Sequence, residues 1–425
     1  MASTSIQRSR TAGSTKTKFT ISMWVKKSAN NAKYLMVNRT DDSNRGLLQF
    51  GGSDELLFQS KYSNTNNAVL QTNRKFRDTS GWYHFVLTGD STLSTAADRL
   101  KLYVNGVRET SFVSETQISQ DGLFYMNEAT TNGFRIGEKG DGSDYFDGYM
   151  SHVHFVDGAA YQASTFGSTD ATTGEWEINT SPSVTYGTNG FFLKMEDGTN
   201  MDLDSSSNNL TFTTNGTLTP TKDCPSNVFC TMNPLSPCIG GTYTFENGNT
   251  TCQQDISRGT LSTLGMNSGK FYAEAKFIST SGSDCMIGIV GINDEANNNA
   301  SGLATGYVYD QDGNKRNSGS GSSYGNTYTT GDIIGIAVDL DNNKIYFSKN
   351  GTWQDSGAPT SGSTGTGAAF TITAASSTPD GFYYFTHADF NTTNKVSWNF
   401  GNGYFGTTAV SSAGTNASAI FRKIY

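Results

Sequence analysis

Alternation of apolar and polar residues with a period of two limits most strongly how this chain can fold. In the segment FTISMWV, Phe19, Ile21, Met23 and Val25 share one face of an extended strand. The same alternation recurs at residues 83–87, 100–104, 334–340 and 396–400. Neither half of the chain shows a sustained 3.6-residue period or a heptad repeat, so the sequence predicts an all-β protein without a coiled-coil shaft.

Length and composition agree with this prediction. The 425 residues include 47 glycines but only 7 prolines, and 16% are charged. At about 100–200 residues per domain, the chain has room for two or three domains. No apolar run approaches the roughly 20 residues of a membrane helix, which argues against an integral membrane protein. The N-terminal residues lack the apolar stretch of a signal peptide.

Changes in pattern divide the chain into four parts. Residues 1–16 are polar and are predicted to form an N-terminal arm, and residues 17–196 contain the first set of strands. Residues 197–239 hold four of the seven prolines and are predicted to be an ordered connector. Residues 240–425 contain the second set of strands.

Charge is unevenly distributed along the chain. Eight basic residues precede the first acid, Asp41, and they are Arg8, Arg10, Lys16, Lys18, Lys26, Lys27, Lys33 and Arg39. They form either a solvated face with a polar tail or an arm that anchors to an acidic surface of another chain. A polar arm without an apolar stripe is expected to become ordered only against a partner. Nucleic acid is a disfavoured partner, because the acidic body would repel phosphate.

Two stretches of sequence resemble known families. FTISMWVK, GWYHFVL, LKLYVNGV and FRIGEKGDGSDYFDGYMSHVHFVDGAAY resemble a laminin-G-type, concanavalin-A-like domain. RGTLSTLGMNSGKFYAEAKF, MIGIVGI and GDIIGIAVDLDNNKIYFSKNGTW resemble a SPRY domain. The resemblance implies two tandem concanavalin-A-like β-sandwiches, or jelly rolls. The combination, together with YQASTFGSTDATTGEWE, is similar to structural proteins of marine tailed bacteriophages.

That similarity implies a non-enzymatic virion protein, either a tail fibre or receptor-binding component or a capsid decoration. Such a protein would be made in the host cytoplasm and released by lysis. Its expected partners are host surface glycans or proteins, other virion proteins, and copies of itself in a homotrimer. The alternatives are a structural adaptor that binds no ligand and a polysaccharide-degrading enzyme.

Acidic residues are not spaced as an enzyme of this fold would require. Related polysaccharide hydrolases place acids as Glu-x-Asp-x-x-Glu on one strand, and this spacing does not occur here. Glu175 and Glu177 flank Trp176, while Glu196 and Asp197 are adjacent. The sequence therefore disfavours catalysis.

The histidines and cysteines are the residues of this chain most suited to bind a transition metal. His152 and His154 lie two residues apart and could chelate a metal, but a packing role is favoured because no third ligand is evident. Cys224, Cys230 and Cys238 cluster in the connector, where buried free thiols are expected and a late disulfide is the alternative. No Cys-x-x-Cys spacing occurs in the chain, which disfavours zinc.

Calcium is the one cofactor left open. The resemblance to laminin-G-type domains implies calcium at one edge of the sandwich, and the candidate ligands are Asp41, Asp42, Asp141 and Asp144. Asx-rich turns without metal are the favoured alternative. No other cofactor is predicted.

Segment 307–328 has the composition of an adaptable contact surface, because it is rich in Tyr, Ser, Gly and Asn. The candidate glycan- or partner-binding residues are Tyr307, Tyr309, Asp310, Asp312, Asn314, Tyr324, Tyr328 and Trp353. Tyr324 is expected to be exposed because Gly and Ser surround it. Trp353 is expected to be buried because it follows a core hairpin.

Overall fold

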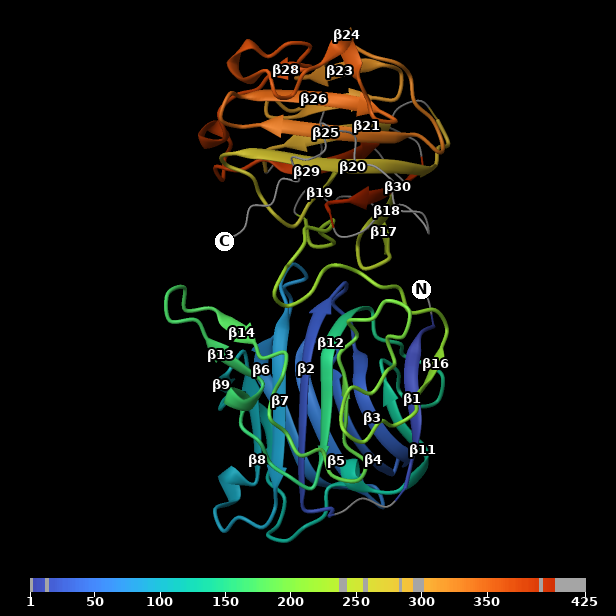
Figure 1. Ribbon diagram of the computed structural model, residues 1–425, viewed down its shortest axis with the longest axis vertical. Helices are drawn as coiled ribbons and strands as arrows, with labels where there is room; N and C mark the ends of the chain where they lie inside the picture. Colours follow the sequence, from blue (N-terminus) through green and yellow to red (C-terminus); the bar gives the residue numbers. More distant parts are fainter. Residues whose placement is uncertain are drawn as a thin grey trace. The chain divides into compact units, whose positions relative to one another are not determined.

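The computed structural model describes residues 3–11, 15–236, 243–254, 259–282, 285–292, 302–389 and 393–401. The chain divides into two compact units, Met1–Val228 and Phe229–Tyr425 (Figure 1). Each unit consists of strands and short 3-10 turns, so the prediction of an all-β protein is confirmed. No helix in the described part of the chain is long and apolar enough to cross a membrane.

The first unit contains two large antiparallel sheets. The eight-stranded sheet has the order β10 (Phe112–Thr116), β6 (Thr65–Lys75), β5 (Glu55–Tyr62), β4 (Asn44–Phe50), β3 (Lys33–Asp41), β11 (Thr130–Ile136), β1 (Ser5–Arg10), β16 (Thr213–Asn215). The six-stranded sheet has the order β15 (Phe191–Leu193), β12 (Gly148–Asp157), β2 (Lys18–Lys27), β7 (Tyr83–Asp90), β8 (Leu100–Val104), β9 (Val107–Arg108). A separate hairpin joins β13 (Gly167–Thr169) to β14 (Trp176–Ile178).

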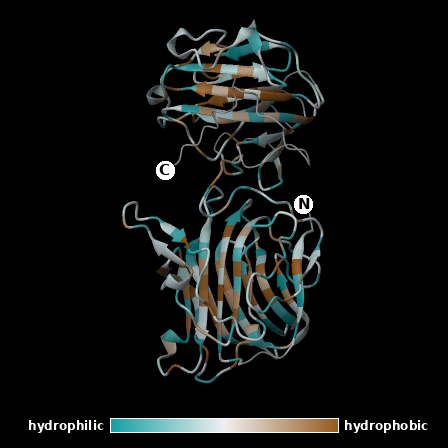
Figure 2. Ribbon diagram, in the orientation of Figure 1, coloured by the Kyte–Doolittle hydropathy of each residue, from teal (hydrophilic) through white to brown (hydrophobic). Residues whose placement is uncertain are grey.

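The core of the first unit follows the alternation in the sequence. Phe19, Ile21, Met23 and Val25 of β2 are fully buried between the sheets, as their spacing predicts. Figure 2 shows the same alternation as brown and pale bands along the strands. In β12 a bulge at His152, whose φ is 49°, interrupts the alternation, and such a bulge shifts the side chains before it to the opposite face.

The outer face of the six-stranded sheet is covered by the chain that runs from β12 to β15. Phe166 and Tyr186 from this covering segment pack on Val86 and Val156 of the sheet, and all four are buried. This face of the first unit is therefore closed to large ligands.

The structure corrects the prediction of an N-terminal arm. Residues 5–10 form β1, which pairs with β11 on one side and β16 on the other. Ile6 lies in the core, and the buried guanidinium of Arg10 lies 3.4 Å from Asp157. Only one residue of this strand enters the apolar core cluster, so its sequence shows no apolar stripe. Two partner strands from distant parts of the chain supply its hydrogen bonds.

The basic N-terminal residues likewise find their partners within the first unit. Six of the eight lie in intramolecular ion pairs: Arg10–Asp157, Lys16–Glu128, Lys18–Asp90, Lys26–Asp223, Lys27–Asp54 and Arg39–Asp141. The interpretation of this region as an anchor for another chain is therefore wrong for these six residues. The acids that neutralise them come later in the sequence.

Residues 197–239, predicted to be a connector, contribute to both units. Phe212 joins the core of the first unit, and Asp223 is buried against Lys26 and Trp82 at 2.7 and 2.8 Å. Met232 lies in the core of the second unit. Cys224 and Cys230 are half-buried, while Cys238 lies outside the described residues.

The second unit also contains two large antiparallel sheets. The eight-stranded sheet has the order β17 (Tyr243–Glu246), β18 (Thr251–Gln254), β30 (Asn394–Asn399), β20 (Lys270–Ser279), β25 (Ile333–Asp339), β26 (Lys344–Lys349), β27 (Thr352–Trp353), with β28 (Phe370–Thr371) paired to β26. The six-stranded sheet has the order β19 (Gly259–Leu261), β29 (Tyr384–Asp389), β21 (Cys285–Val290), β22 (Tyr307–Asp310), β23 (Asn314–Asn317), β24 (Ser320–Ser323). Ile334, Ile336 and Val338 enter the core as the alternation predicts.

Candidate functional site

The tyrosines proposed as a sugar platform lie in the core of the second unit. Tyr307, Tyr309, Tyr324 and Tyr328 have exposed fractions of 5%, 0%, 8% and 2%. Tyr309 packs against the rings of Tyr324, Tyr328 and Phe347, with centroids 5.2–5.6 Å apart. The prediction that Tyr324 is exposed is therefore wrong, and the four candidate rings are core residues. Composition suggested a loop, but β22 carries two of the rings into the sandwich, and the chain after β24 folds back to bury the others.

The polar candidates in the same segment bond to one another. The carboxylate of Asp310 is buried and pairs with Arg316, which also holds Asp312 at 2.7 Å. The amide nitrogen of Asn314 donates to Asp312 at 2.7 Å. These groups stabilise the turn between β22 and β23.

Trp353 lies on a different surface, the outer face of the eight-stranded sheet of the second unit. Contrary to the prediction it is only half-buried, because β27 is the edge strand of the sheet. Its ring meets that of Tyr272, on β20, edge to face, with centroids 6.3 Å apart. The two rings form the aromatic part of a surface that we call the Trp353 face, consisting of Tyr272, Glu274, Ser348, Trp353 and Asn399.

Strand register brings the polar members of the Trp353 face into one row. Glu274 is paired with Asn399 on β30 and with Gly335 on β25, while Ser348 on β26 is paired with Gly335 and Trp353. A Cβ atom at Gly335 would lie 2.4 Å from the Ser348 hydroxyl and 2.6 Å from that of Tyr272. The glycine therefore makes room for the tyrosine to cross the sheet.

Hydrogen bonds hold the carboxylate of Glu274 in place. The Tyr272 hydroxyl donates to one oxygen at 3.0 Å, and the Asn399 amide donates to the other at 3.1 Å. Burial raises the pKa of Tyr272, so its hydroxyl remains a donor at neutral pH. Glu274 and Asn399 are half-buried and so reach solvent.

The Trp353 face has the chemical groups that recognise a sugar ring. Aromatic rings pack on the apolar C–H face of a sugar, while a fixed carboxylate and an amide bond its hydroxyls. Sequence reasoning identified Trp353 but missed Tyr272, Glu274 and Asn399. The alternation in GKFYAEAKF placed Tyr272 and Glu274 on the polar face of a strand, but only the sheet order brings them to Trp353.

The acids proposed for calcium surround a side chain that is itself positively charged. The guanidinium of Arg39 lies 3.5 Å from the carboxylate of Asp42 and 3.3 Å from that of Asp141. The ammonium group of Lys139 lies 3.1 Å from the carboxylate of Asp141. Asp41 accepts a hydrogen bond from the backbone of its own turn, and Asp144 is exposed. The structure brings two of the proposed loops together, as a calcium site requires, but Arg39 supplies the positive charge there.

Three histidines of the first unit are buried in packing roles. Nδ1 of His154 bonds to the hydroxyl of Tyr186 at 2.9 Å, and the ring stacks on Phe192 at 3.9 Å. His152 bonds to its neighbour Ser151 at 2.8 Å. Burial lowers the pKa of His152 to about 4 and that of His154 well below its usual value.

The two pairs of acidic residues discussed for catalysis lie in different parts of the first unit. Glu175 and Glu177 are exposed on the covering segment, while Trp176 between them donates to Nδ1 of His84 at 2.8 Å. Glu196 lies 3.6 Å from Lys194, and Asp197 caps a turn.

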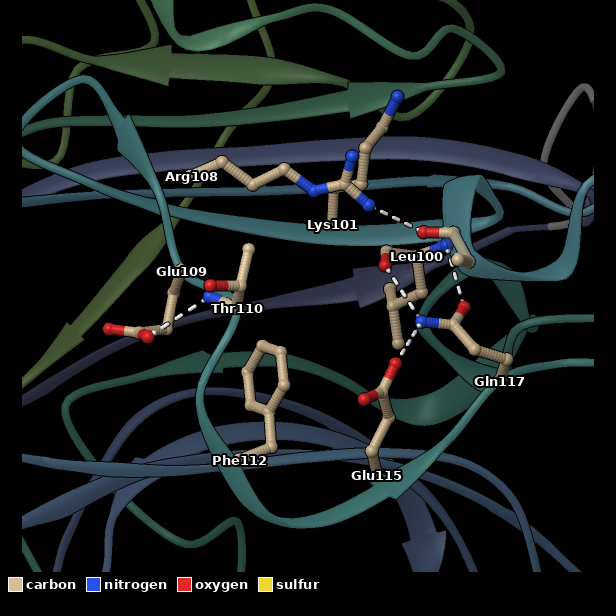
Figure 3. Close-up of a pocket in the computed structure, with 9 residues that line it drawn as sticks. Leu100, Lys101, Arg108, Glu109, Thr110, Phe112, Glu115 and Gln117 are labelled. Atoms are coloured by element: carbon tan, nitrogen blue, oxygen red, sulfur yellow. Dashed lines mark hydrogen bonds between the residues drawn. The ribbon is translucent and has the colours of Figure 1, made fainter.

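A shallow groove of about 190 Å³ lies at the edge of the first unit (Figure 3). It is lined from β8, β9, β10 and their connections, where both sheets end. Arg108 within it bonds to Asp98 at 3.2 Å, and Gln117 links Glu115 to the backbone of Leu100. Because these polar groups bond to one another, the groove is a weaker candidate than the Trp353 face.

The families of both units follow from comparison with known domains. Residues 2–164 match the Concanavalin A-like lectin/glucanases superfamily in its laminin-G form, and residues 270–402 match the SPRY domain. The chain therefore carries a lectin-like β-sandwich followed by a SPRY β-sandwich, and the predicted tandem arrangement is confirmed. Both are binding folds that are generally non-enzymatic.

Curated relatives match a small part of the chain. Ran-binding protein 9 from Danio rerio is 39% identical over 87 residues, which are 20% of this chain and 14% of that protein. Ran-binding protein 9 from Mus musculus is 38% identical over 87 residues, or 20% of this chain and 13% of that protein. The chain thus spans only about a seventh of these relatives, and their activities as whole proteins do not transfer to it.

Solved structures resemble the chain at low identity. The SPRY domain of human HERC1 is 17% identical and covers 38% of this chain and 94% of its own, with a TM-score of 0.30. A putative carbohydrate binding protein from Bacteroides ovatus is 18% identical and covers 50% of this chain and 56% of its own, with a TM-score of 0.32.

Proposed function

We propose that this chain is a non-enzymatic recognition protein whose SPRY unit binds glycans on the Trp353 face. The observation that carries the proposal is the half-buried pair of aromatic rings, Tyr272 and Trp353, beside the fixed carboxylate of Glu274. A sugar ring stacked on Trp353 would place its hydroxyls within reach of Glu274 and Asn399. The outer face of the six-stranded sheet in the lectin-like unit is covered by its own chain, so this face offers no comparable binding surface.

A glycan array probed with the full-length protein tests this proposal. Trp353→Ala should weaken binding about tenfold, the loss expected for one stacked ring of about 1.4 kcal/mol. Leu264→Ala, which removes an exposed apolar side chain elsewhere in the same unit, is the matched control and should bind as the parent does. Equal binding by Trp353→Ala and the parent would contradict the proposal. An array without any signal would favour a protein ligand or a structural adaptor.

We further propose that the protein is a component of a tailed-phage virion, either at the tail or as a capsid decoration. The resemblance of the domain combination supports this proposal. The fully buried Cys252 and Cys285, which form no disulfide with any residue that the structure describes, also support it, because they suit folding in a reducing host cytoplasm. Peptide mass spectrometry of purified particles should detect the chain, and its absence from particles would contradict the assignment.

Association into a homotrimer belongs to the same proposal. Light scattering coupled to size-exclusion chromatography measures it directly, and a mass of one chain at micromolar concentration would contradict it. Other virion proteins would be the remaining partners, identified by cross-linking within the particle.

A further inference from the structure

Three chemically reactive side chains meet inside the apolar core of the SPRY unit. Cys285 on β21 and Asp389 on β29 are paired across the six-stranded sheet, and His387 lies two residues before Asp389. All three are 0% exposed. One ligand atom from each lies within 4.8 Å of the others. Ordinary packing does not require a thiol, an imidazole and a carboxylate together in a core of this kind.

The imidazole of His387 is held from one side only. Its Nδ1 lies 3.3 Å from Sγ of Cys252, on β18 of the opposite sheet. Its Nε2 finds no hydrogen-bond partner among the residues that the structure describes, and it lies 3.9 Å from Oδ2 of Asp389. The carboxylate of Asp389 is oriented by Asn394, whose amide donates at 2.6 Å and whose backbone donates at 3.1 Å.

The 3.9 Å between Nε2 of His387 and Oδ2 of Asp389 does not correspond to a hydrogen bond. A hydrogen bond requires about 2.7–3.2 Å between nitrogen and oxygen, so 3.9 Å is too long. An unsatisfied buried nitrogen costs about 1–3 kcal/mol, which a native core normally avoids.

A zinc ion fits the space between the ligand atoms of Cys285, His387 and Asp389. It matches their separation, their chemical type and their charge. Zinc binds nitrogen and oxygen at about 2.0–2.2 Å, so two such ligands of a tetrahedral ion lie about 3.4 Å apart. The observed 3.9 Å is within about half an ångström of that separation. Sulfur, imidazole and carboxylate together suit Zn²⁺ rather than Ca²⁺ or Mg²⁺. A thiolate and a carboxylate would also cancel its two charges.

We propose that Cys285, His387 and Asp389 form a structural Zn²⁺ site in the core of the SPRY unit. Nε2 of His387 is the ligand atom, and a water molecule completes the coordination. Cys252 is a positioning residue, because it accepts the hydrogen bond from Nδ1–H that orients the ring. The spacing of cysteines in the sequence argued against zinc, but strand pairing brings ligands together from distant segments.

Metal analysis of the full-length protein tests the site. The protein is purified from zinc-supplemented cells, dialysed, and measured by elemental mass spectrometry. Stoichiometric zinc is expected, together with a lower melting temperature after chelation that added Zn²⁺ restores. Replacement by Co²⁺ should give the absorption of a tetrahedral site with one thiolate ligand. Protein without zinc, whose melting temperature responds to neither chelator nor Zn²⁺, would overturn the proposal.

Substitutions identify the ligands. Cys285→Ala should abolish stoichiometric zinc and the cobalt–thiolate absorption, whereas Cys252→Ala should weaken zinc binding by about 10–100-fold. Cys224→Ala, in the lectin-like unit, is the matched control and should retain the metal. Zinc retained in full by Cys285→Ala would overturn the proposal. If that variant does not fold, the cobalt spectrum of the parent protein still decides whether a thiolate binds the metal.

Discussion

Acidification from about pH 7.5 to about pH 5 should destabilise the lectin-like unit by about 4 kcal/mol through His84 and His152, and His154 adds to this loss in the same direction. His84, His152 and His154 are 0%, 6% and 2% exposed. Burial lowers the pKa of His84 to about 3 and that of His152 to about 4, and that of His154 lies well below 6.5. His84 and His152 are therefore neutral in the folded unit at both pH values, and burial disfavours the charged form of His154 in the same way.

The magnitude follows from the difference in bound protons. Above pH 6.5 the folded and unfolded states are both neutral at these sites, so the histidines add no pH dependence. Below pH 6.5 the unfolded state takes up protons that the folded state excludes, and each histidine lowers the free energy of unfolding by about 1.4 kcal/mol per pH unit. Over about 1.5 units His84 and His152 therefore contribute about 2 kcal/mol each.

Pulse proteolysis in urea measures this loss for each unit separately, with fragments assigned by mass spectrometry. His84→Gln is the informative variant. Nδ1 of His84 accepts from Trp176 and its Nε2 donates to Ser22 at 2.8 Å, and a glutamine amide offers the same acceptor and donor without titrating. The variant should reduce the acid-induced loss in the lectin-like unit by about 2 kcal/mol and leave the SPRY unit unchanged.

Two results would refute this reasoning. The first is a urea midpoint of the lectin-like unit that is equal at the two pH values. The second is a full acid-induced loss in His84→Gln, which would assign the pH dependence to carboxylates instead.

Arg10→Met should lower the free energy of unfolding by about 3–5 kcal/mol in urea titrations, because it leaves Asp157 buried without its cation. A loss below about 1 kcal/mol would show that the first strand is not anchored by this pair. Tyr324→Ala should cost about 3–5 kcal/mol and lower the melting temperature, while half-buried Trp353→Ala should cost much less. Equal melting temperatures for the two variants would contradict the assignment of core and surface. Gly335→Ala should weaken glycan binding on the array as Trp353→Ala does, because its Cβ atom would displace the tyrosine ring that crosses it.

The sequence by itself determined where most of the strands lie and which of their faces are apolar. Alternation along residues 19–25 and 334–338 predicted the buried sides, because a strand places successive side chains on opposite faces. The dipeptide Asn105-Gly106 after β8 is typical of a tight turn, and both residues have the positive φ that such a turn requires, 46° and 78°. These features depend on neighbours in the sequence, so local patterns reveal them.

Tertiary structure alone decided which polar and aromatic residues are buried. Arg10 was predicted to lie in an arm, but it is buried because Asp157 comes to it from β12. Tyr324 lies among glycines and serines, but rings from β22 and β26 enclose it. Trp353 meets Tyr272 only because β27 and β20 belong to the same sheet. Pairing between strands that are distant in the sequence decides whether these side chains are buried. The composition of a segment does not reveal which distant strand will lie beside it.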